Sequence, residues 1–214
     1  MSPPTDPASA PAAETDGRRL RRDRNRDAVV DALLTLYDEG NLEPSSDQIA
    51  ARSGVSARSL FRYFDDVDDL CQAAIQRQQQ RVRHLVTINV ERNASVQERV
   101  EALVHQRTSL FEAIGPVATV SRLRAPFQAV VADRLTRTRH SLRDQLGELF
   151  AEELSALPTP VAASRLAAAD VVSSFEAWRL LRDDQRLSRS AASAVMADAV
   201  LTLISTLPTT GGPR

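Results

Sequence analysis

The spacing of apolar residues first becomes regular near the N-terminus. Between residues 18 and 39 they recur at helical intervals, at Val30, Leu33, Leu34 and Tyr37. This spacing places them on one face of an amphipathic helix, and Gly40 is suited to end it. A helix over residues 18–39 is therefore predicted.

Two short helices are predicted next. Ser45 and Gln48 have the spacing of a capping box, which indicates a helix through residue 53. Gly54 then tolerates the positive φ of a tight turn, and Ser56 is placed to cap a second short helix through residue 64. This arrangement is typical of a helix-turn-helix.

Long intervals without proline make up most of the remaining chain. They are rich in helix-forming residues and lack the alternating pattern of strands. Helices are predicted over residues 67–90, 96–114, 117–124, 127–157, 161–184 and 189–207, the first capped by Asp65 or Asp66. We expect an all-α fold of about nine helices: a head over 18–66 and a larger helical domain over 67–207, between disordered tails at 1–17 and 208–214.

Composition limits the class of protein. With 43% hydrophobic and 26% charged residues, the 214-residue chain is typical of a globular protein. No apolar stretch reaches the roughly 18 residues of a membrane span. Residues 1–17 lack the pattern of a secretory signal and the lone Cys71 can form no internal disulfide, so a cytoplasmic protein is expected. No metal-ligand or catalytic spacing occurs, so we expect no metal, no cofactor and no enzymatic activity.

Positive charge is concentrated in two segments although the net charge is −1. Residues 48–64 hold three arginines and no acid, and residues 18–26 hold six arginines and one aspartate. Arginine donates well to phosphate and guanine, so DNA is the expected partner. The run at 18–26 fits either a solvated helix start or an arm that reaches the minor groove. The predicted DNA-binding residues are Arg18, Arg19, Arg21, Arg22, Ser45, Ser46, Ser56, Ala57, Arg58, Ser59, Arg62 and Tyr63.

The segment from Ser45 to Phe64, SSDQIAARSGVSARSLFRYF, resembles the DNA-binding head of the TetR family of bacterial regulators. Residues that match the family pattern are Ile49, Ala50, Gly54, Val55, Ser56, Leu60, Arg62, Phe64 and Leu70. The stretch SSFEAWRLLRDDQRLS, Ser173 to Ser188, is similar to the penultimate helix of many actinobacterial members.

The resemblance departs from the family pattern at three positions. The family's phosphate-touching tyrosine corresponds to Phe61, and Tyr63, at a position often held by histidine in the family, is a candidate to supply the missing hydroxyl. The family's lysine corresponds to Val67, which lies among four aspartates at positions 65–69. We expect these acids to suit the start of a helix but to repel phosphate, so this helix start should contribute little to DNA binding.

The C-terminal helices predict a homodimer. The helix over 189–207 is apolar over more than one face, and the helix before it is rich in small residues, which fits a four-helix interface between two subunits. The resemblance implies the same arrangement, and it implies a small-molecule effector held among the middle helices. The predicted interface residues are Val171, Phe175, Val195, Met196, Ala199, Val200, Leu203, Ile204 and Leu207. The predicted effector-pocket residues are His105, Phe111, Arg124, Phe127, His140, Phe175 and Trp178.

Two functions are compatible with these patterns. The first is a homodimeric transcription regulator that binds double-stranded DNA at a palindromic operator, as a repressor that a small-molecule effector releases. The alternative is a helical small-molecule-binding protein, or an enzyme, that retains the head without binding DNA. Neither function requires a membrane.

Overall fold

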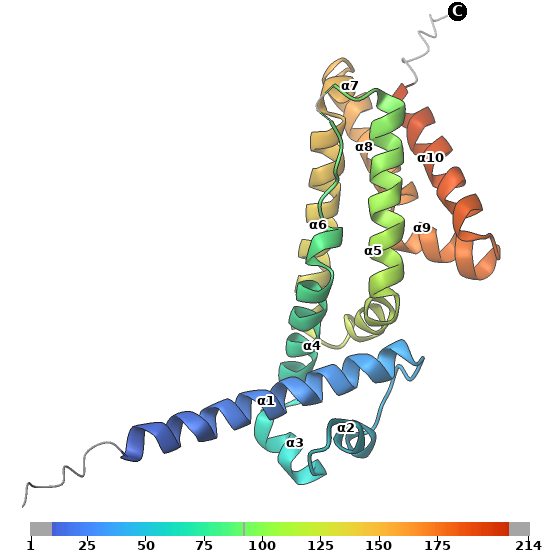
Figure 1. Cartoon of the computed structure of the whole chain (residues 1–214). Coiled ribbons are helices and arrows are strands. Elements are labelled where there is room, and N and C mark those ends of the chain that lie inside the picture. Colours follow the sequence, from blue (N-terminus) through green and yellow to red (C-terminus); the bar gives the residue numbers. More distant parts are fainter. Residues whose placement is uncertain (1–9, 92, 206–214) are drawn as a thin grey trace, which may run out of the picture. The chain divides into compact units, whose positions relative to one another are not determined.

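The computed structural model describes residues 10–91 and 93–205, and every regular element among them is a helix. The expected all-α class is confirmed, with ten α-helices in this part of the chain (Figure 1). They are α1 (Ala10–Asp38), α2 (Ser46–Ser53), α3 (Ala57–Tyr63), α4 (Val67–Arg81), α5 (Val96–Arg124), α6 (Ala129–Leu149), α7 (Ala151–Ser155), α8 (Thr159–Val172), α9 (Phe175–Arg179) and α10 (Arg189–Ser205). A 3-10 helix, η1 (Arg83–Leu85), and a π-helix, η2 (Leu180–Asp184), complete the set.

The chain forms two compact units. The first contains the residues up to Gln80 together with Pro116–Val131, and the second contains Arg81–Gly115 and the residues from Ala132 onward. This division differs from the boundary expected after residue 66. Helix α4 belongs with the head as far as Gln80, because Leu70, Ala73 and Ala74 are buried in the head core.

The apolar stripe of α1 forms the centre of the first unit. Its four members, Val30, Leu33, Leu34 and Tyr37, are at most 3% exposed. Side chains from α2, α3, α4 and the end of α5 complete this core, namely Ile49, Leu60, Phe64, Leu70, Val117 and Val120. Burying a valine or leucine contributes about 1.5–3 kcal/mol, so this shared core fixes the short helices α2 and α3 that could not persist alone.

The second unit has its own core, which α5, α6, α8, α9 and α10 build. Phe111 of α5 meets Phe175 of α9 edge to face, with ring centroids 5.6 Å apart and an interplanar angle of 83°. Trp178, which lies on α9 with Phe175, is 3% exposed. Helix α10 packs along α8, and Ala192, Met196, Val200 and Ile204 are its buried residues.

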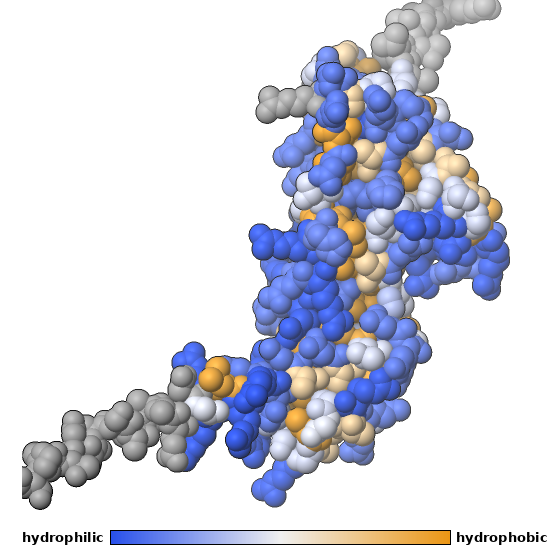
Figure 2. Space-filling view, in the orientation of Figure 1, coloured by the Kyte–Doolittle hydropathy of each residue, from blue (hydrophilic) through white to orange (hydrophobic). Residues whose placement is uncertain are grey.

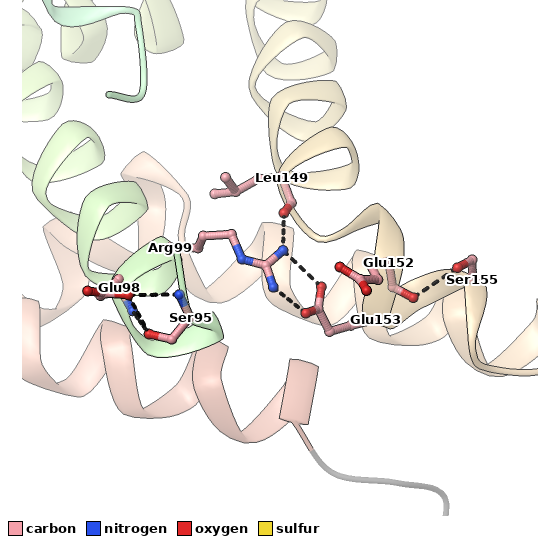
Figure 3. Close-up of polar contacts among 7 residues, drawn as sticks. All are labelled: Ser95, Glu98, Arg99, Leu149, Glu152, Glu153 and Ser155. Carbon is pink, nitrogen blue, oxygen red and sulfur yellow. Dashed lines mark hydrogen bonds and ion pairs between the residues drawn. The ribbon is translucent and has the colours of Figure 1, made fainter. Parts of the chain in front are cut away.

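A partly buried arginine ties the start of α5 to the end of α6 and to α7. Arg99 donates to the carbonyl of Leu149 at 2.8 Å and forms an ion pair with Glu153 (Figure 3). The same guanidinium lies 5.6 Å from the ring centre of Phe150. Ser95 and Glu98 form a capping box that begins α5 just before this contact. The start of α5 is therefore fixed by its own capping box, and one long-range ion pair holds it against α7.

Helix α5 runs without interruption through Pro116, so the predicted break between residues 114 and 117 is wrong. An interior proline costs a helix about 3 kcal/mol. The burial of Phe111 before it, and of Val117 and Val120 after it, outweighs that cost.

Other predicted boundaries also differ from the structure. Residues 10–17 were expected in a disordered tail, but α1 already begins at Ala10, in an alanine-rich stretch with high helix propensity. The predicted helix over 161–184 is divided because the side chain of Ser174 caps α9 at the backbone N–H of Ala177. The predicted helix over 127–157 breaks at Phe150, where φ is −115°. The expected tails at 1–9 and 208–214 lie outside the described residues.

Candidate nucleic-acid interface

Helix α2 begins at the capping box that the sequence predicts. The Ser45 side chain accepts from the Gln48 backbone N–H at 3.2 Å, and the Gln48 side chain accepts from the Ser45 N–H at 2.9 Å. Ser46, the first helical residue, is half-buried. Because its side chain serves as a cap, Ser45 has a structural role that exists independently of DNA.

The turn between α2 and α3 has the geometry of a helix-turn-helix. Gly54 ends α2 with φ +72°, in the left-handed region that favours glycine. Ser56 then caps α3 by accepting from the Ser59 backbone N–H at 3.2 Å, and the two hydroxyls are 2.9 Å apart. Only three residues, 54–56, therefore separate the end of α2 from the start of α3.

Helix α3 has a buried side and an exposed side. Leu60 and Phe64 are 4% and 3% exposed and anchor the helix in the head core. Arg58 and Arg62 are exposed, and the described residues give neither of them an ion pair. Ala57 and Ser59 are half-buried. The exposed side of α3 is thus a basic surface whose two guanidinium groups can reach phosphates or base edges.

Phe61 is 64% exposed on the same side of α3. The sequence pattern indicates that this position lacks a hydroxyl, but it does not indicate that the aromatic ring points outward. An exposed phenylalanine between two arginines can make apolar contact with a thymine methyl group.

Tyr63 and Arg26 tie α1 to the α3–α4 region. The Tyr63 hydroxyl accepts from the Asn25 side chain at 2.8 Å, which leaves its own proton available for donation. Arg26 forms an ion pair with Asp69 at 2.8 Å and stacks 4.7 Å above the ring centre of Phe64. Sequence reasoning missed Asn25, because its partner is 38 positions away and no local pattern connects them.

Two of the four aspartates at the start of α4, Asp66 and Asp69, make contacts within the head. The Asp66 carboxylate accepts from the Asp69 backbone N–H at 2.8 Å, as expected of a helix cap. The Asp69 carboxylate is neutralised by Arg26. Pairing of this kind reduces the repulsion that the cluster would exert on phosphate.

The arginines near the start of the chain lie on a helix. Arg18, Arg19, Arg21 and Arg22 are all exposed on α1, ahead of its buried stripe. Figure 2 shows mainly hydrophilic side chains along this part of α1. A helix can present its guanidinium groups to phosphates, but it does not fit a minor groove as readily as an extended arm does. The helical structure of this segment therefore favours phosphate contact over minor-groove insertion.

The residues predicted for the effector pocket do not all enter one cavity. Phe127 is 88% exposed, and the side chains of His105 and His140 are exposed as well. Phe111, Phe175 and Trp178 are buried in the core of the second unit, whereas Arg124 and Phe127 belong to the first.

The predicted dimer residues divide into two groups. Phe175, Met196, Val200 and Ile204 are buried within the chain itself, so they form its own core. Val171 and Val195 are 65% and 46% exposed, and Ala199 and Leu203 are half-buried. Leu207 lies outside the described residues. Leu180, which the sequence did not indicate, is 51% exposed on the adjacent π-helix.

Membrane spans and metal sites have no support in the described residues. None of their helices combines the length and apolar character needed to cross a bilayer. No group of three or more potential metal-ligating side chains occurs among them.

Comparisons with known proteins identify the fold. The sequence matches no family model and no curated protein. The structure is similar to a transcriptional regulator from Rhodococcus sp. RHA1, with a TM-score of 0.63 and 18% identity over 87% of this chain and 99% of that chain. It is also similar to a TetR-family transcriptional regulator from Rhodococcus sp., with a TM-score of 0.60 and 19% identity over 85% and 99% of the two chains. A third similar structure is the multidrug-binding protein EbrR complexed with imidazole, with a TM-score of 0.52 and 19% identity over 88% and 97%. The chain therefore has the fold of TetR-family transcriptional regulators.

Proposed function

We propose that this chain is a DNA-binding transcription regulator that acts as a homodimer and responds to a small-molecule effector. The observation that carries the proposal is the exposed basic side of α3, where Arg58 and Arg62 flank Phe61. The opposite side of α3 is locked into the head core by Leu60 and Phe64. A rigid helix with free arginines is suited to insertion in a major groove.

A dimer would give this helix its sequence specificity. Two copies of α3 held about 34 Å apart would read half-sites one DNA turn apart, and hence a palindromic operator. The exposed apolar side chains of the second unit, including Val171 and Val195, support an interface there. Repression is the proposed outcome, with release when effector binding favours a state of lower DNA affinity.

The DNA-binding part is tested by fluorescence anisotropy on DNA fragments that flank the protein's own gene. Arg58→Ala is expected to weaken binding by about 1–3 kcal/mol, the value of one good base contact. Arg137→Ala, which removes an exposed arginine from the second unit, is the matched control and should leave affinity unchanged. Equal binding by wild type and Arg58→Ala would contradict the assignment. Affinity should also fall steeply with salt, because phosphate contacts release counterions.

The effector part is supported by the fold and by the buried aromatic residues of the second unit. The similar structure of EbrR, described as multidrug-binding, is complexed with imidazole. A ligand that separates Phe111 from Phe175 would alter the surroundings of Trp178, the one tryptophan of the chain. Titration with imidazole should therefore change Trp178 fluorescence, and Phe111→Ala should alter that response. If imidazole leaves the Trp178 fluorescence unchanged in wild type and in Phe111→Ala, imidazole-like compounds are not ligands of the second unit.

A further inference from the structure

The first unit contains a groove to which the proposed DNA-binding function assigns no ligand. It has a volume of about 240 Å³ and lies among α1, α2, α3, α4 and the last turn of α5. An apolar cavity of about 150 Å³ already accepts benzene, so this space suffices for a single ring with a small substituent. Its walls are mainly apolar and include Leu33, Ile49, Leu60 and Leu70.

Arg124 supplies a positive charge to this groove. Arg124 and Tyr37 both line the groove, and Arg124 acts to lower the pKa of the Tyr37 hydroxyl against the larger effect of burial. The described residues place no carboxylate within ion-pair distance of Arg124. A half-buried arginine of this kind favours a carboxylate, which it can bind through two parallel hydrogen bonds.

Asp66 limits the number of negative charges that a ligand in this groove can carry. Its carboxylate also lines the groove, so a ligand with a second negative charge would be repelled there. The apolar walls disfavour a strongly hydrated ion such as inorganic phosphate, because burying such an ion among leucines costs solvation that one arginine does not replace. One negative charge and an apolar body are the combination that fits.

We propose that this groove binds a small monocarboxylate, with its carboxylate at Arg124 and its apolar body against Leu33, Leu60 and Leu70. The site is separate from the effector pocket proposed for the second unit, because every lining residue belongs to the first. Leu60 and Phe61 of α3, with Phe64 directly after it, form part of its wall, so an occupant contacts the same helix that presents Arg58 and Arg62.

The charge requirement is tested by calorimetry on the full-length protein without DNA, using sodium benzoate as the probe. Benzamide has nearly the same shape and no charge, and it should bind wild type roughly ten- to a hundredfold more weakly, the factor expected for a charge-assisted hydrogen bond. Arg124→Met should weaken benzoate binding by a similar factor. Arg122→Met is the matched control, because Arg122 lies on the same helix but does not line the groove.

The location is tested at Cys71, which lines the groove and is the one cysteine of the chain. Benzoate should slow alkylation of Cys71 by N-ethylmaleimide, followed by mass spectrometry, and should leave Trp178 fluorescence unchanged. Absence of benzoate binding, equal affinity for benzoate and benzamide, or undiminished alkylation in saturating benzoate would each overturn the proposal. The benzamide comparison requires no variant, so it stands even if Arg124→Met fails to fold. None of these measurements depends on whether the protein binds DNA.

Discussion

Arg52 and Glu39 form a bidentate ion pair across the head, with nitrogen to oxygen distances of 2.6 and 2.8 Å. The hydrogen bonds from Arg52 lower the pKa of the Glu39 carboxyl. Of the three arginines in the helix-turn-helix segment, Arg52 is therefore already directed at a partner in the turn that follows α1, whereas Arg58 and Arg62 face solvent.

This pairing predicts that Arg52→Ala has little effect on DNA affinity. A guanidinium held by Glu39 contributes little net charge at the interface, so the variant should bind operator DNA within about twofold of wild type and keep its salt dependence. Anisotropy titrations at several salt concentrations provide the measurement. A loss as large as that of Arg58→Ala would show that Arg52 leaves Glu39 to contact DNA.

The start of α4 yields a prediction about stability. Asp66 caps this helix at the Asp69 N–H, and removing an N-cap costs about 1 kcal/mol. Asp66→Ala should lower the free energy of unfolding by that amount in urea denaturation. Asp65→Ala, at an adjacent exposed position, should change the free energy by no more than about 0.5 kcal/mol. Equal effects of the two substitutions would indicate that the cap is unimportant.

Local signals in the sequence were sufficient to locate the helix-turn-helix. The capping box at Ser45, the left-handed Gly54 and the cap at Ser56 each act within three or four residues, so a single sequence reveals them. The buried stripe on α1 follows from helical periodicity in the same way. These features fix α2 and α3 and the side of α3 that faces outward.

The features that the sequence did not predict depend on packing between residues far apart in the chain. Helix α5 passes through Pro116 because buried side chains on both sides outweigh a local penalty. Met196, Val200 and Ile204 have the spacing of an interface, yet they are buried within the chain, since periodicity does not distinguish a partner helix of the same chain from one of another chain. The contacts of Asn25 and Arg26 join positions about forty residues apart, beyond the reach of any local pattern.

Val171 provides the test of the dimer. It is 65% exposed at the end of α8, so a second subunit is the partner we expect for it. Val171→Glu should convert the dimer to a monomer in sedimentation velocity, because an unpaired charge in an apolar interface is strongly unfavourable. Leu123→Glu, at a similarly exposed apolar position of the first unit, should leave the dimer intact. Retention of the dimer by Val171→Glu would exclude this surface as the interface.

Tyr37 makes stability depend on pH in the alkaline range. Burial, with a contribution from Cys71, raises the pKa of the Tyr37 hydroxyl from 10.0 to about 12, although Arg124 acts in the opposite direction. The native state therefore holds this proton while the unfolded chain loses it. The stabilisation is complete below pH 10 and is lost as the pH rises toward 12, by about 2–3 kcal/mol at 1.36 kcal/mol per pKa unit.

Denaturant unfolding at several pH values between 9 and 12 measures this loss. Tyr37→Phe should show a smaller decline than wild type, because it has no proton to lose. Tyr63→Phe, which removes the other tyrosine of the chain, should retain the wild-type decline. Parallel pH profiles for wild type and Tyr37→Phe would show that Tyr37 is not the group responsible.

Arg107 is the most deeply buried charge among the described residues, at 2% exposed. Its guanidinium donates to the Leu142 carbonyl at 2.7 Å and to the Gln145 side chain at 3.0 Å, which joins α5 to α6. Burial lowers the pKa of this guanidinium to about 10, and Asp170 opposes the shift. At neutral pH the group is still charged, so neutral acceptors solvate a cation in the core of the second unit.

A double-mutant cycle measures what this network contributes. Arg107→Met should lower the free energy of unfolding by about 1–3 kcal/mol, because it leaves buried acceptors without a donor. Gln145→Leu alone should also destabilise, since it removes one acceptor from the buried cation. The double variant lacks both partners of that hydrogen bond, so its loss should be smaller than the two single losses combined, by about 0.5–1.5 kcal/mol. Strict additivity would show that Arg107 and Gln145 act independently and that the Leu142 carbonyl and the Gln106 side chain, which also accepts from Arg107, hold the guanidinium.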